Sequence, residues 1–242
     1  MQKTNKYKII EFLKTLLTAI IIAGLFRSFL YEPFHIPSGS MKPGLLPGDF
    51  ILVSKYSYGY SRYSFPFALA PINNRILSKT PERGEVVVFR LPANPKINYI
   101  KRLVGVPCDK VQMLNGILYI NGKIVPKTKS LNNFFDEDMQ QFVPTYIETF
   151  PMQHSFEILD AQQNALQDNT PIYTVPPNHY FFMGDNRDHS QDSRYIRQVG
   201  FVHEKYIIGK AQIIFMSAED SLLKLWKLPF SIRFSRLFDL IK

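Results

Sequence analysis

Two serines and one lysine are the residues of this 242-residue chain whose types and surroundings could do chemistry. Ser38 and Ser40 flank Gly39 within residues 33–49, a loop stiffened by four prolines and suited to exposing a hydroxyl. Lys101 follows Tyr99 and Ile100 in a largely apolar stretch. A serine hydroxyl is a poor nucleophile without a base. Burial lowers a lysine pKa by roughly 3 to 5 units, so Lys101 is the candidate base.

Extended backbone would place Tyr99, Lys101 and Leu103 on one face, because side chains alternate along a strand. A pKa lowered by about 3 units leaves a neutral amine at mildly alkaline pH. We therefore expect Ser40 to attack a carbonyl and Lys101 to take the proton and return it to the leaving amine, through an acyl-enzyme. If the loop is extended, Ser38 shares a face with Ser40 and donates to the oxyanion beside the Ser40 amide.

A third polar segment, residues 184–194, carries alternating acids and bases. We interpret its charged residues as an ion-pair network without a chemical role, in preference to catalytic groups. They are Asp185, Arg187, Asp192 and Arg194. The five histidines are scattered and no metal-ligand spacing occurs, so we expect neither a metal nor another cofactor. The single cysteine, Cys108, rules out an intrachain disulfide.

An apolar segment precedes these groups in the sequence and could anchor them to a membrane. Residues 16–26 are apolar, and counting from Ile9 to Tyr31 gives a membrane-spanning length. A cleaved signal sequence is the alternative, but it needs a small-x-small site after the run, and residues 26–33 contain none. Four lysines before the span, against Arg27 after it, predict a cytoplasmic N-terminus.

The remainder of the chain predicts a mainly β protein. Residues 50–56 and 85–90 are typical of strands, and two Asn-Gly pairs within 111–125 predict a β-meander. We expect an irregular loop over 56–80 and a polar insertion over 127–170. The chain should return to the core sheet in three further segments, 179–183, 199–202 and 206–216.

These elements predict an antiparallel-sheet catalytic core with an inserted smaller β subdomain, preceded by one N-terminal transmembrane helix. The expected units are a tip and anchor (1–31), a core (32–109 plus 177–218), an inserted subdomain (110–176) and a basic amphipathic tail (219–242). The tail is either a solvated terminal strand or helix, or a membrane-surface contact. The net charge of +9 gathers beside apolar sequence, which favours a membrane over nucleic acid.

Four motifs follow one another after the apolar segment. They are Pro-Ser-Gly-Ser-Met (37–41), Arg-Gly-Glu-Val-Val-Val-Phe (83–89), Tyr-Ile-Lys-Arg (99–102) and Gly-Asp-Asn-Arg-Asp (184–188). In this order they resemble the type I bacterial signal peptidases, membrane-anchored Ser/Lys endopeptidases that remove secretory signal sequences.

The resemblance implies roles for particular residues. Ser40 matches the nucleophile, Lys101 the base, Ser38 the oxyanion donor and Ser190 the serine that orients the lysine; the four charged residues of 184–194 match positions that brace the loop. An extended peptide would pair with strand edges near Ile36 and Tyr99. Apolar sites for small residues one and three positions before the cut would be lined by Phe34, Ile36, Met41, Leu45, Val88, Tyr99 and Ile100. Core residues would be equally apolar, so composition does not separate the two interpretations.

The resemblance also implies a setting. The substrates would be precursor proteins bearing signal peptides, cut after a small-x-small motif, and the other partners would be the lipid bilayer and, by proximity, the secretion machinery. The protein would cross the bacterial inner membrane once, with its catalytic domain on the periplasmic side. Three residues depart from the family pattern: Gly44, where threonine is common, Cys108, where glycine is usual, and His189, where asparagine is frequent.

Two other functions fit part of the pattern. A soluble Ser/Lys autoprotease joined to a DNA-binding module would begin with a helix-turn-helix, whereas this chain begins with a long apolar run. A non-enzymatic membrane-anchored β module could hold extended peptides, with Ser40 and Lys101 as ordinary loop and strand residues. Hydrolysis of a secretory precursor separates it from a peptidase.

Overall fold

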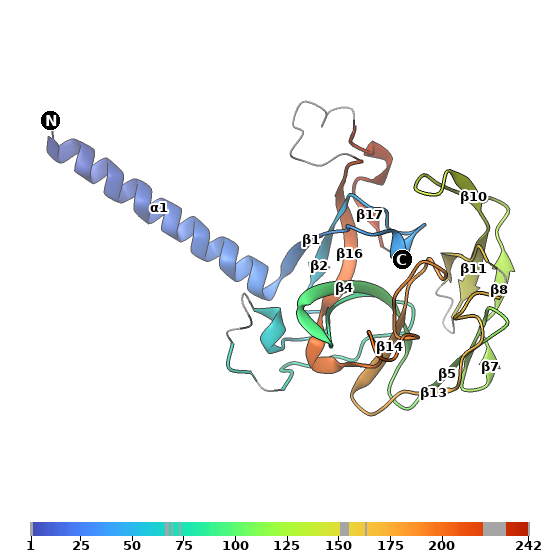
Figure 1. Ribbon diagram of the computed structural model, residues 1–242. Helices are drawn as coiled ribbons and strands as arrows, with labels where there is room; N and C mark the ends of the chain where they lie inside the picture. The colour runs from blue at the N-terminus through green and yellow to red at the C-terminus, as the bar shows by residue number, and fades with distance from the viewer. Residues whose placement is uncertain are drawn as a thin grey trace.

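One long helix followed by antiparallel β-sheets makes up the computed structural model of the chain (Figure 1). The structure describes residues 2–65, 68, 70–72, 74–150, 155–162, 164–219 and 231–241. The mainly β fold with one N-terminal apolar helix is confirmed.

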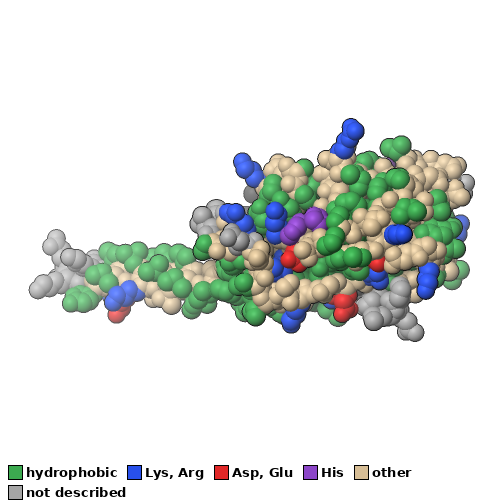
Figure 2. Space-filling view, turned by 90° about the horizontal axis from the view of Figure 1, so that it is seen from below, with side chains coloured by type: hydrophobic (Ala, Val, Ile, Leu, Met, Phe, Trp, Pro, Cys, Tyr) green, Lys and Arg blue, Asp and Glu red, His purple; other side chains and the backbone are tan. Residues whose placement is uncertain are grey.

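Helix α1 (Gln2–Phe29) projects from the body as a rod, and many hydrophobic side chains lie along the part of it that Figure 2 draws in colour (Figures 1 and 2). Its apolar part, Tyr7–Phe29, is 23 residues long and has no buried residues in its most apolar stretch. At about 1.5 Å per residue it is roughly 35 Å long, enough to cross the hydrocarbon core of a bilayer. Among the described residues it is the one α-helix of more than a single residue, and they contain no helix-turn-helix.

Charged residues fix the end of α1 to the sheet. Glu32 accepts from Arg27 at 2.6 Å and from Lys55 at 2.7 Å. The Lys55 side chain is buried and also donates to the Ser64 carbonyl. Tyr60 Oη donates to the Phe29 carbonyl at 2.8 Å. The helix is thus joined to the body by directional contacts as well as by the chain.

The main sheet carries the candidate residues. Its strand order is β1-β2-β16-β3-β4-β14-β15, with β17 on β16. Strand β1 overlaps residues 33–49, which we expected to form a loop; Pro33 lacks a backbone donor, and the sheet tolerates it because β1 is the edge strand. The bounds are β1 Tyr31–His35, β2 Asp49–Ser54, β3 Val86–Leu91, β4 Asn94–Gly105, β14 His179–Met183, β15 Val202–His203, β16 Ile207–Ser217 and β17 Asp239–Leu240.

Three smaller sheets lie between β4 and β14 in sequence, in the orders β13-β5-β6-β7, β12-β11-β8 and β10-β9. Asn115 and Asn121 have φ of 48° and 54°, each followed by a glycine at positive φ, so both Asn-Gly turns form and the meander is confirmed. The bounds are β5 Lys110–Leu114, β6 Ile117–Ile120, β7 Lys123–Ile124, β8 Lys127–Lys129, β9 Phe134–Asp136, β10 Gln141–Val143, β11 Thr145–Thr149, β12 Ser155–Leu159 and β13 Tyr173–Thr174.

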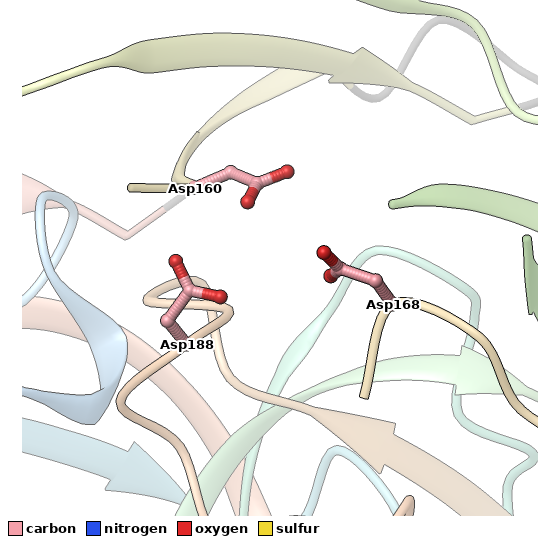
Figure 3. A group of neighbouring side chains, drawn as sticks. All are labelled: Asp160, Asp168 and Asp188. Carbon is pink, nitrogen blue, oxygen red and sulfur yellow. The ribbon is translucent and has the colours of Figure 1, made fainter. Parts of the chain in front are cut away.

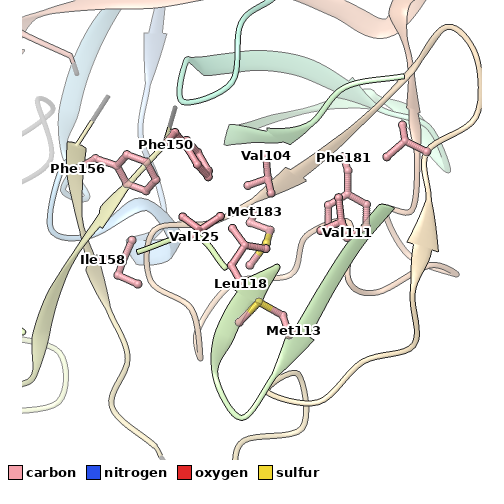
Figure 4. Close-up of a cluster of buried hydrophobic side chains, with 11 residues drawn as sticks. Val104, Val111, Met113, Leu118, Val125, Phe150, Phe156, Ile158, Phe181 and Met183 are labelled. Atoms are coloured by element: carbon pink, nitrogen blue, oxygen red, sulfur yellow. The ribbon is translucent and has the colours of Figure 1, made fainter. Parts of the chain in front are cut away.

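A shared hydrophobic core joins the small sheets to the main sheet (Figure 4). Val104 of β4 and Met183 of β14 pack in one cluster with Leu118 of β6 and Phe156 and Ile158 of β12. Burial of such side chains contributes about 1.5 to 3 kcal/mol each. The small sheets are therefore packed on the sheet that carries Lys101.

The described part of the C-terminal tail, residues 231–241, returns to the main sheet; residues 220–230 and 242 lie outside the described residues. It contains η5 (Phe234–Arg236) and the short exposed strand β17. Arg236 donates to the buried Asp49 carboxylate at 2.6 and 3.2 Å. A terminal strand is present, as the interpretation of the tail as a solvated strand or helix expected. Arg236, however, is not solvated, because it is paired with the buried Asp49 carboxylate.

Candidate active site

Ser40 and Lys101 are in direct contact. Ser40 lies in the 3₁₀ turn η1 (Gly39–Met41) and Lys101 on β4, and 2.5 Å separates Lys101 Nζ from Ser40 Oγ. The two residues are 9% and 4% exposed. Nζ also donates to the Ile100 carbonyl at 2.9 Å. The structure thus brings together the nucleophile and base inferred from sequence.

Burial sets the proton affinity of the amine. Loss of water around Lys101 lowers its pKa to about 8; the Asp192 and Asp185 carboxylates oppose that effect, and Arg194 adds to it. The ordinary value is 10.5. At pH 7 about one amine in ten is then neutral, which is enough for a general base.

The serine loop differs from the expected extended form. Residues Gly39–Met41 make a 3₁₀ turn, which the proline-rich sequence did not indicate. Ser38 precedes the turn in extended conformation, is exposed, and places its Oγ 3.4 Å from Ser40 Oγ. Ser38 therefore lies beside Ser40. The 3₁₀ turn brings the two hydroxyls together, and not the alternation of side chains along an extended strand.

The polar loop 184–194 supports the serine loop. The Asn186 amide donates to the Ser40 carbonyl at 3.1 Å, and Asn186 Nδ2 donates to the Gly39 carbonyl at 3.2 Å. A Cβ on Gly184 would lie 2.1 Å from Ser190 Oγ and 2.5 Å from the Ser40 carbonyl oxygen, so a side chain is excluded there. The sequence analysis missed Asn186, although it stands inside the Gly-Asp-Asn-Arg-Asp motif.

Ser190 is buried against Gly184. Within the described part of the chain it makes no hydrogen bond to Lys101, so its role in orienting the lysine stays a prediction. Its place between Gly184 and the serine loop is compatible with a positioning role.

The charged residues of this loop form buried ion pairs. Asp185 receives two bonds from Arg102, at 2.8 and 2.6 Å, and Asp192 receives two from Arg194, both at 2.9 Å. Burial acts to raise the pKa of Asp192, but Arg194 and the Gly184 amide outweigh it and hold that pKa below its usual range. Arg187 pairs at 2.5 Å with both oxygens of Glu148, a partner that no sequence signal revealed. The arrangement is a network that braces the loop.

The residues expected to line substrate sites divide by burial. Phe34, Tyr99 and Ile100 are half-buried and offer surface to a peptide. The other four are almost fully buried in a single cluster, against which Phe34 and Ile100 pack: Ile36, Met41, Leu45 and Val88. Tyr99 packs against a different cluster from Ile100, because neighbours on a strand face opposite sides.

The three departures from the family pattern have visible settings. A Cβ on Gly44 would meet its nearest neighbours at 3.7 Å, so a side chain has room. Cys108 is exposed at φ 71°, a left-handed conformation that favours glycine, so cysteine there costs roughly 1 to 2 kcal/mol. His189 is exposed. None contacts Ser40 or Lys101 by a described hydrogen bond.

Three carboxylates gather elsewhere, at Asp160, Asp168 and Asp188, with ligand oxygens within 4.8 Å of one another (Figure 3). Lys127 Nζ bonds to Asp160, and backbone amides donate to Asp168 at 2.8 Å and Asp188 at 2.7 Å. Burial raises the pKa of Asp168, and the charges of the other two carboxylates add to it. Protein groups thus hold this cluster, and its described hydrogen bonds do not include Ser40 or Lys101.

Comparison with known proteins identifies the family. The model of the family described as "Signal peptidase, peptidase S26" matches residues 9–216. Signal peptidase I of Rickettsia typhi is 38% identical over 255 residues, covering 98% of this chain and 95% of that protein. Signal peptidase I of Rickettsia akari is 40% identical over 208 residues, covering 83% and 77%.

A crystal structure of a signal peptidase I from Enterococcus faecalis is 27% identical, covers 55% of this chain and 97% of that chain, and has a TM-score of 0.33. The family model and the Rickettsia relatives carry the assignment, and they confirm the resemblance read from the four motifs. The apolar helix α1 fits a membrane-anchored protein. The chain belongs to the signal peptidase family, peptidase S26, and is a peptidase of the signal peptidase I type.

Proposed function

We propose that the protein is a membrane-anchored serine endopeptidase that cleaves N-terminal signal peptides from secreted precursors after a small-x-small motif. The observation that supports this best is the buried Lys101 amine, 2.5 Å from Ser40 Oγ. A depressed pKa and a hydroxyl within reach are the two requirements for a Ser/Lys nucleophile.

The proposed reaction uses the chain's own groups at each step. Lys101 Nζ accepts the Ser40 proton as Oγ attacks the scissile carbonyl. The Ser40 amide and the Ser38 hydroxyl donate to the oxyanion of the tetrahedral intermediate. Lys101 then gives its proton to the leaving amine, which leaves an acyl-enzyme on Ser40. A water molecule, deprotonated by Lys101, hydrolyses that ester and frees the enzyme.

The proposed substrate is an extended peptide beside β1 and β4. Strand β1 is the edge of the main sheet, and β14 pairs with β4 only from Arg102 to Gly105. Residues 94–101 therefore have no described strand on that side, which supports pairing of a peptide by β-augmentation. Phe34, Tyr99 and Ile100 would contact its side chains above the buried floor.

The proposal extends to location and organisation. The four lysines that precede the apolar run at 16–26 support a cytoplasmic N-terminus, a single crossing of the bacterial inner membrane and a periplasmic catalytic domain. The partners would be precursors with signal peptides, the bilayer and, by proximity, the secretion machinery, with no nucleic acid. The four-unit division at 1–31, 32–109 plus 177–218, 110–176 and 219–242 belongs to the same proposal.

Cleavage of a precursor with an Ala-x-Ala site by the detergent-extracted chain tests this function. We expect cleavage by the wild type and a fall of roughly 10⁴-fold or more for Ser40→Ala and Lys101→Met, because each removes half of one catalytic unit. Lys123→Met, which alters an exposed lysine of β7, is the control and should cleave normally. Wild-type activity in either active-site variant would disprove that residue's role, and an intact precursor with the wild type would disprove the function.

A further inference from the structure

Lys42 is a buried lysine that the proposed mechanism does not use. It follows the serine turn directly, and its side chain is 6% exposed. Its Nζ lies 2.8 Å from Asp136 Oδ1 and 2.6 Å from Asp138 Oδ2. Burial alone would lower the pKa of Lys42, but the bonds to the two carboxylates outweigh it and raise the pKa above its usual value. Lys42 is thus charged wherever Lys101 is titrating.

The two carboxylates belong to the β9–β10 hairpin of the polar insertion (Figure 1): Asp136 is the last residue of β9, and Asp138 lies in the turn that follows. Asp136 is 4% exposed, and its Oδ1 also accepts the backbone amides of Asp138 at 2.9 Å and Met139 at 3.3 Å. Asp138 is 74% exposed, so water weakens its pairing. Asp136 is therefore the principal anchor, fixed by its own turn and facing a buried ammonium.

The stem of Lys42 crosses the glycine between the two serines. A Cβ on Gly39 would lie 2.8 Å from Lys42 Cε and 3.1 Å from Cδ, so the stem occupies the space where a side chain would be. The Lys42 amide donates to the Gly39 carbonyl at 3.1 Å, and Asn186 Nδ2 donates to the same oxygen at 3.2 Å. The oxygen of Gly39 is thus held from two directions while the Lys42 stem covers its Cα.

That oxygen determines where the Ser40 amide points. The Gly39 carbonyl and the Ser40 N–H belong to one planar trans peptide and point in opposite directions. Holding the oxygen therefore aims the N–H. An oxyanion donor is most effective when it is fixed before the charge develops, because no reorganisation is then needed.

We propose that Lys42, anchored by Asp136, is a positioning residue that fixes the Gly39–Ser40 peptide for the reaction, and that the β9–β10 hairpin supports the active site through this contact. The inference rests on the proposed function, which gives the Ser40 amide its part in oxyanion binding. The described hydrogen bonds of Lys42 go to Asp136, Asp138 and the Gly39 carbonyl, and none goes to β1 or β4, the strands proposed to hold the substrate. Its loss should therefore slow turnover without weakening substrate binding.

Steady-state kinetics of the full chain with a precursor peptide tests the proposal. Lys42→Met keeps a long stem without the charge, and Asp136→Asn keeps an acceptor for the amides of its turn. We expect kcat to fall about 10- to 100-fold in Lys42→Met, the range caused by misplacing a reacting group by about 1 Å, with KM changed less than about two-fold. The fall should be smaller in Asp136→Asn, and the double variant should be no slower than Lys42→Met, because both act through one contact.

Lys127→Met is the matched control. It removes a lysine from the same insertion that is also paired with a carboxylate, Asp160, but makes no described bond to the serine loop. Its kcat should equal that of the wild type even if its melting temperature falls. Amide hydrogen exchange is the second measurement: exchange at the Lys42 amide should accelerate in Lys42→Met and Asp136→Asn but not in the control.

Two results would overturn the inference. One is a wild-type kcat in folded Lys42→Met and Asp136→Asn; the other is a raised KM at unchanged kcat, which would make the hairpin a binding surface instead. Both are distinct from failure of the proposed function, in which the wild type itself would leave the precursor intact. Should Lys42→Met fail to fold, Asp136→Asn and the exchange measurement decide the question.

Discussion

The Lys101 amine lies in a buried site that disfavours its charged form and leaves its neutral form beside the Ser40 hydroxyl. Few described polar groups reach its Nζ, since Ser40 Oγ and the Ile100 carbonyl are its hydrogen-bond partners. The nearest acids, Asp185 and Asp192, are each bonded to their own arginine. Pairing those acids elsewhere limits how far they can stabilise the ammonium, so desolvation prevails and the pKa falls.

This balance predicts the pH dependence of the enzyme. Only neutral Lys101 can accept the Ser40 proton, so kcat/KM should rise about tenfold per pH unit below pH 8 and level off above it. The measurement is kcat/KM between pH 6 and pH 10 with a precursor peptide. An inflection near the ordinary lysine value of 10.5 would show that Lys101 is not desolvated in the working enzyme.

The contact between Ser40 and Lys101 was easier to predict from sequence than the residues that support it. Ser40 and Lys101 stand out because a serine in a Pro/Gly loop and a lysine in an apolar strand are unusual in themselves. Lys42 and Glu148 carry no such signal, since a lysine or glutamate is ordinary until its partner is known. Those partners, Asp136 and Arg187, are 94 and 39 positions away, and only the folded chain brings them together.

At the scale of elements, strands with local signals were predictable. Residues of β2, β3 and the β5–β7 meander carry apolar runs or Asn-Gly turns, which act over a few positions. Strands β1 and β17 carry none, because each depends on a neighbour distant in sequence, β2 and β16 respectively. The polar β9–β10 hairpin was likewise unforeseen, although it supplies the anchor of Lys42.

The C-terminal segment acts as a brace across the start of β2. The Asp49 carboxylate is buried and receives bonds from Arg236, Ser217 and the Leu46 amide. Arg236 also donates to the Gly44 carbonyl at 2.9 Å. The same segment lines a cavity of about 670 Å³ beneath the serine loop, which Met41 and Leu45 also line. The tail thus contacts the serine loop at Gly44, whereas the β9–β10 hairpin contacts it at Lys42.

Removal of that brace should cost stability. Arg236→Ala leaves Asp49 with fewer partners in a buried site, so the free energy of unfolding should fall by about 2 kcal/mol. The loss should be smaller than for a fully buried pair because two partners of Asp49 remain, Ser217 at 2.6 Å and Arg233 at 4.0 Å. Urea unfolding of the detergent-solubilised chain measures it. The control is Arg197→Ala, an exposed arginine, which should change stability by less than about 0.5 kcal/mol. Equal stability of the two variants would show that the contacts of Arg236 do not stabilise the fold.

For the whole molecule, the decisive division is between an apolar rod and a folded body. The described contacts of helix α1 with the body lie near its C-terminal end, among them those of Arg27 and Phe29. The sheets have their own continuous cores. The body should therefore fold and act without the rod.

A chain lacking residues 1–26 tests this division, because it keeps the Arg27–Glu32 pair and the contacts of Phe29. We expect it to partition into water in a detergent phase-separation assay while the full chain enters the detergent phase. Its cleavage of a short precursor peptide should be unchanged within about two-fold, since no active-site residue contacts the removed segment. Retention in detergent would reveal a second lipid-binding surface, for which the basic tail is the candidate.

The rigid exit of α1 has a consequence for which bonds can be cut. Ser40 stands only eleven positions after Phe29, so its hydroxyl lies less than about 40 Å from the end of the helix. Glu32 forms ion pairs with Arg27 of the helix and Lys55 of the body, and these pairs fix residues 30–39 to the body. The distance of Ser40 from the lipid headgroups is therefore set by the fold. The distance of Ser40 from the membrane would then select the bond that is cut. A precursor bond at the same distance from the headgroups is within reach of Ser40, and an identical sequence deeper in the bilayer or far out in solvent is not.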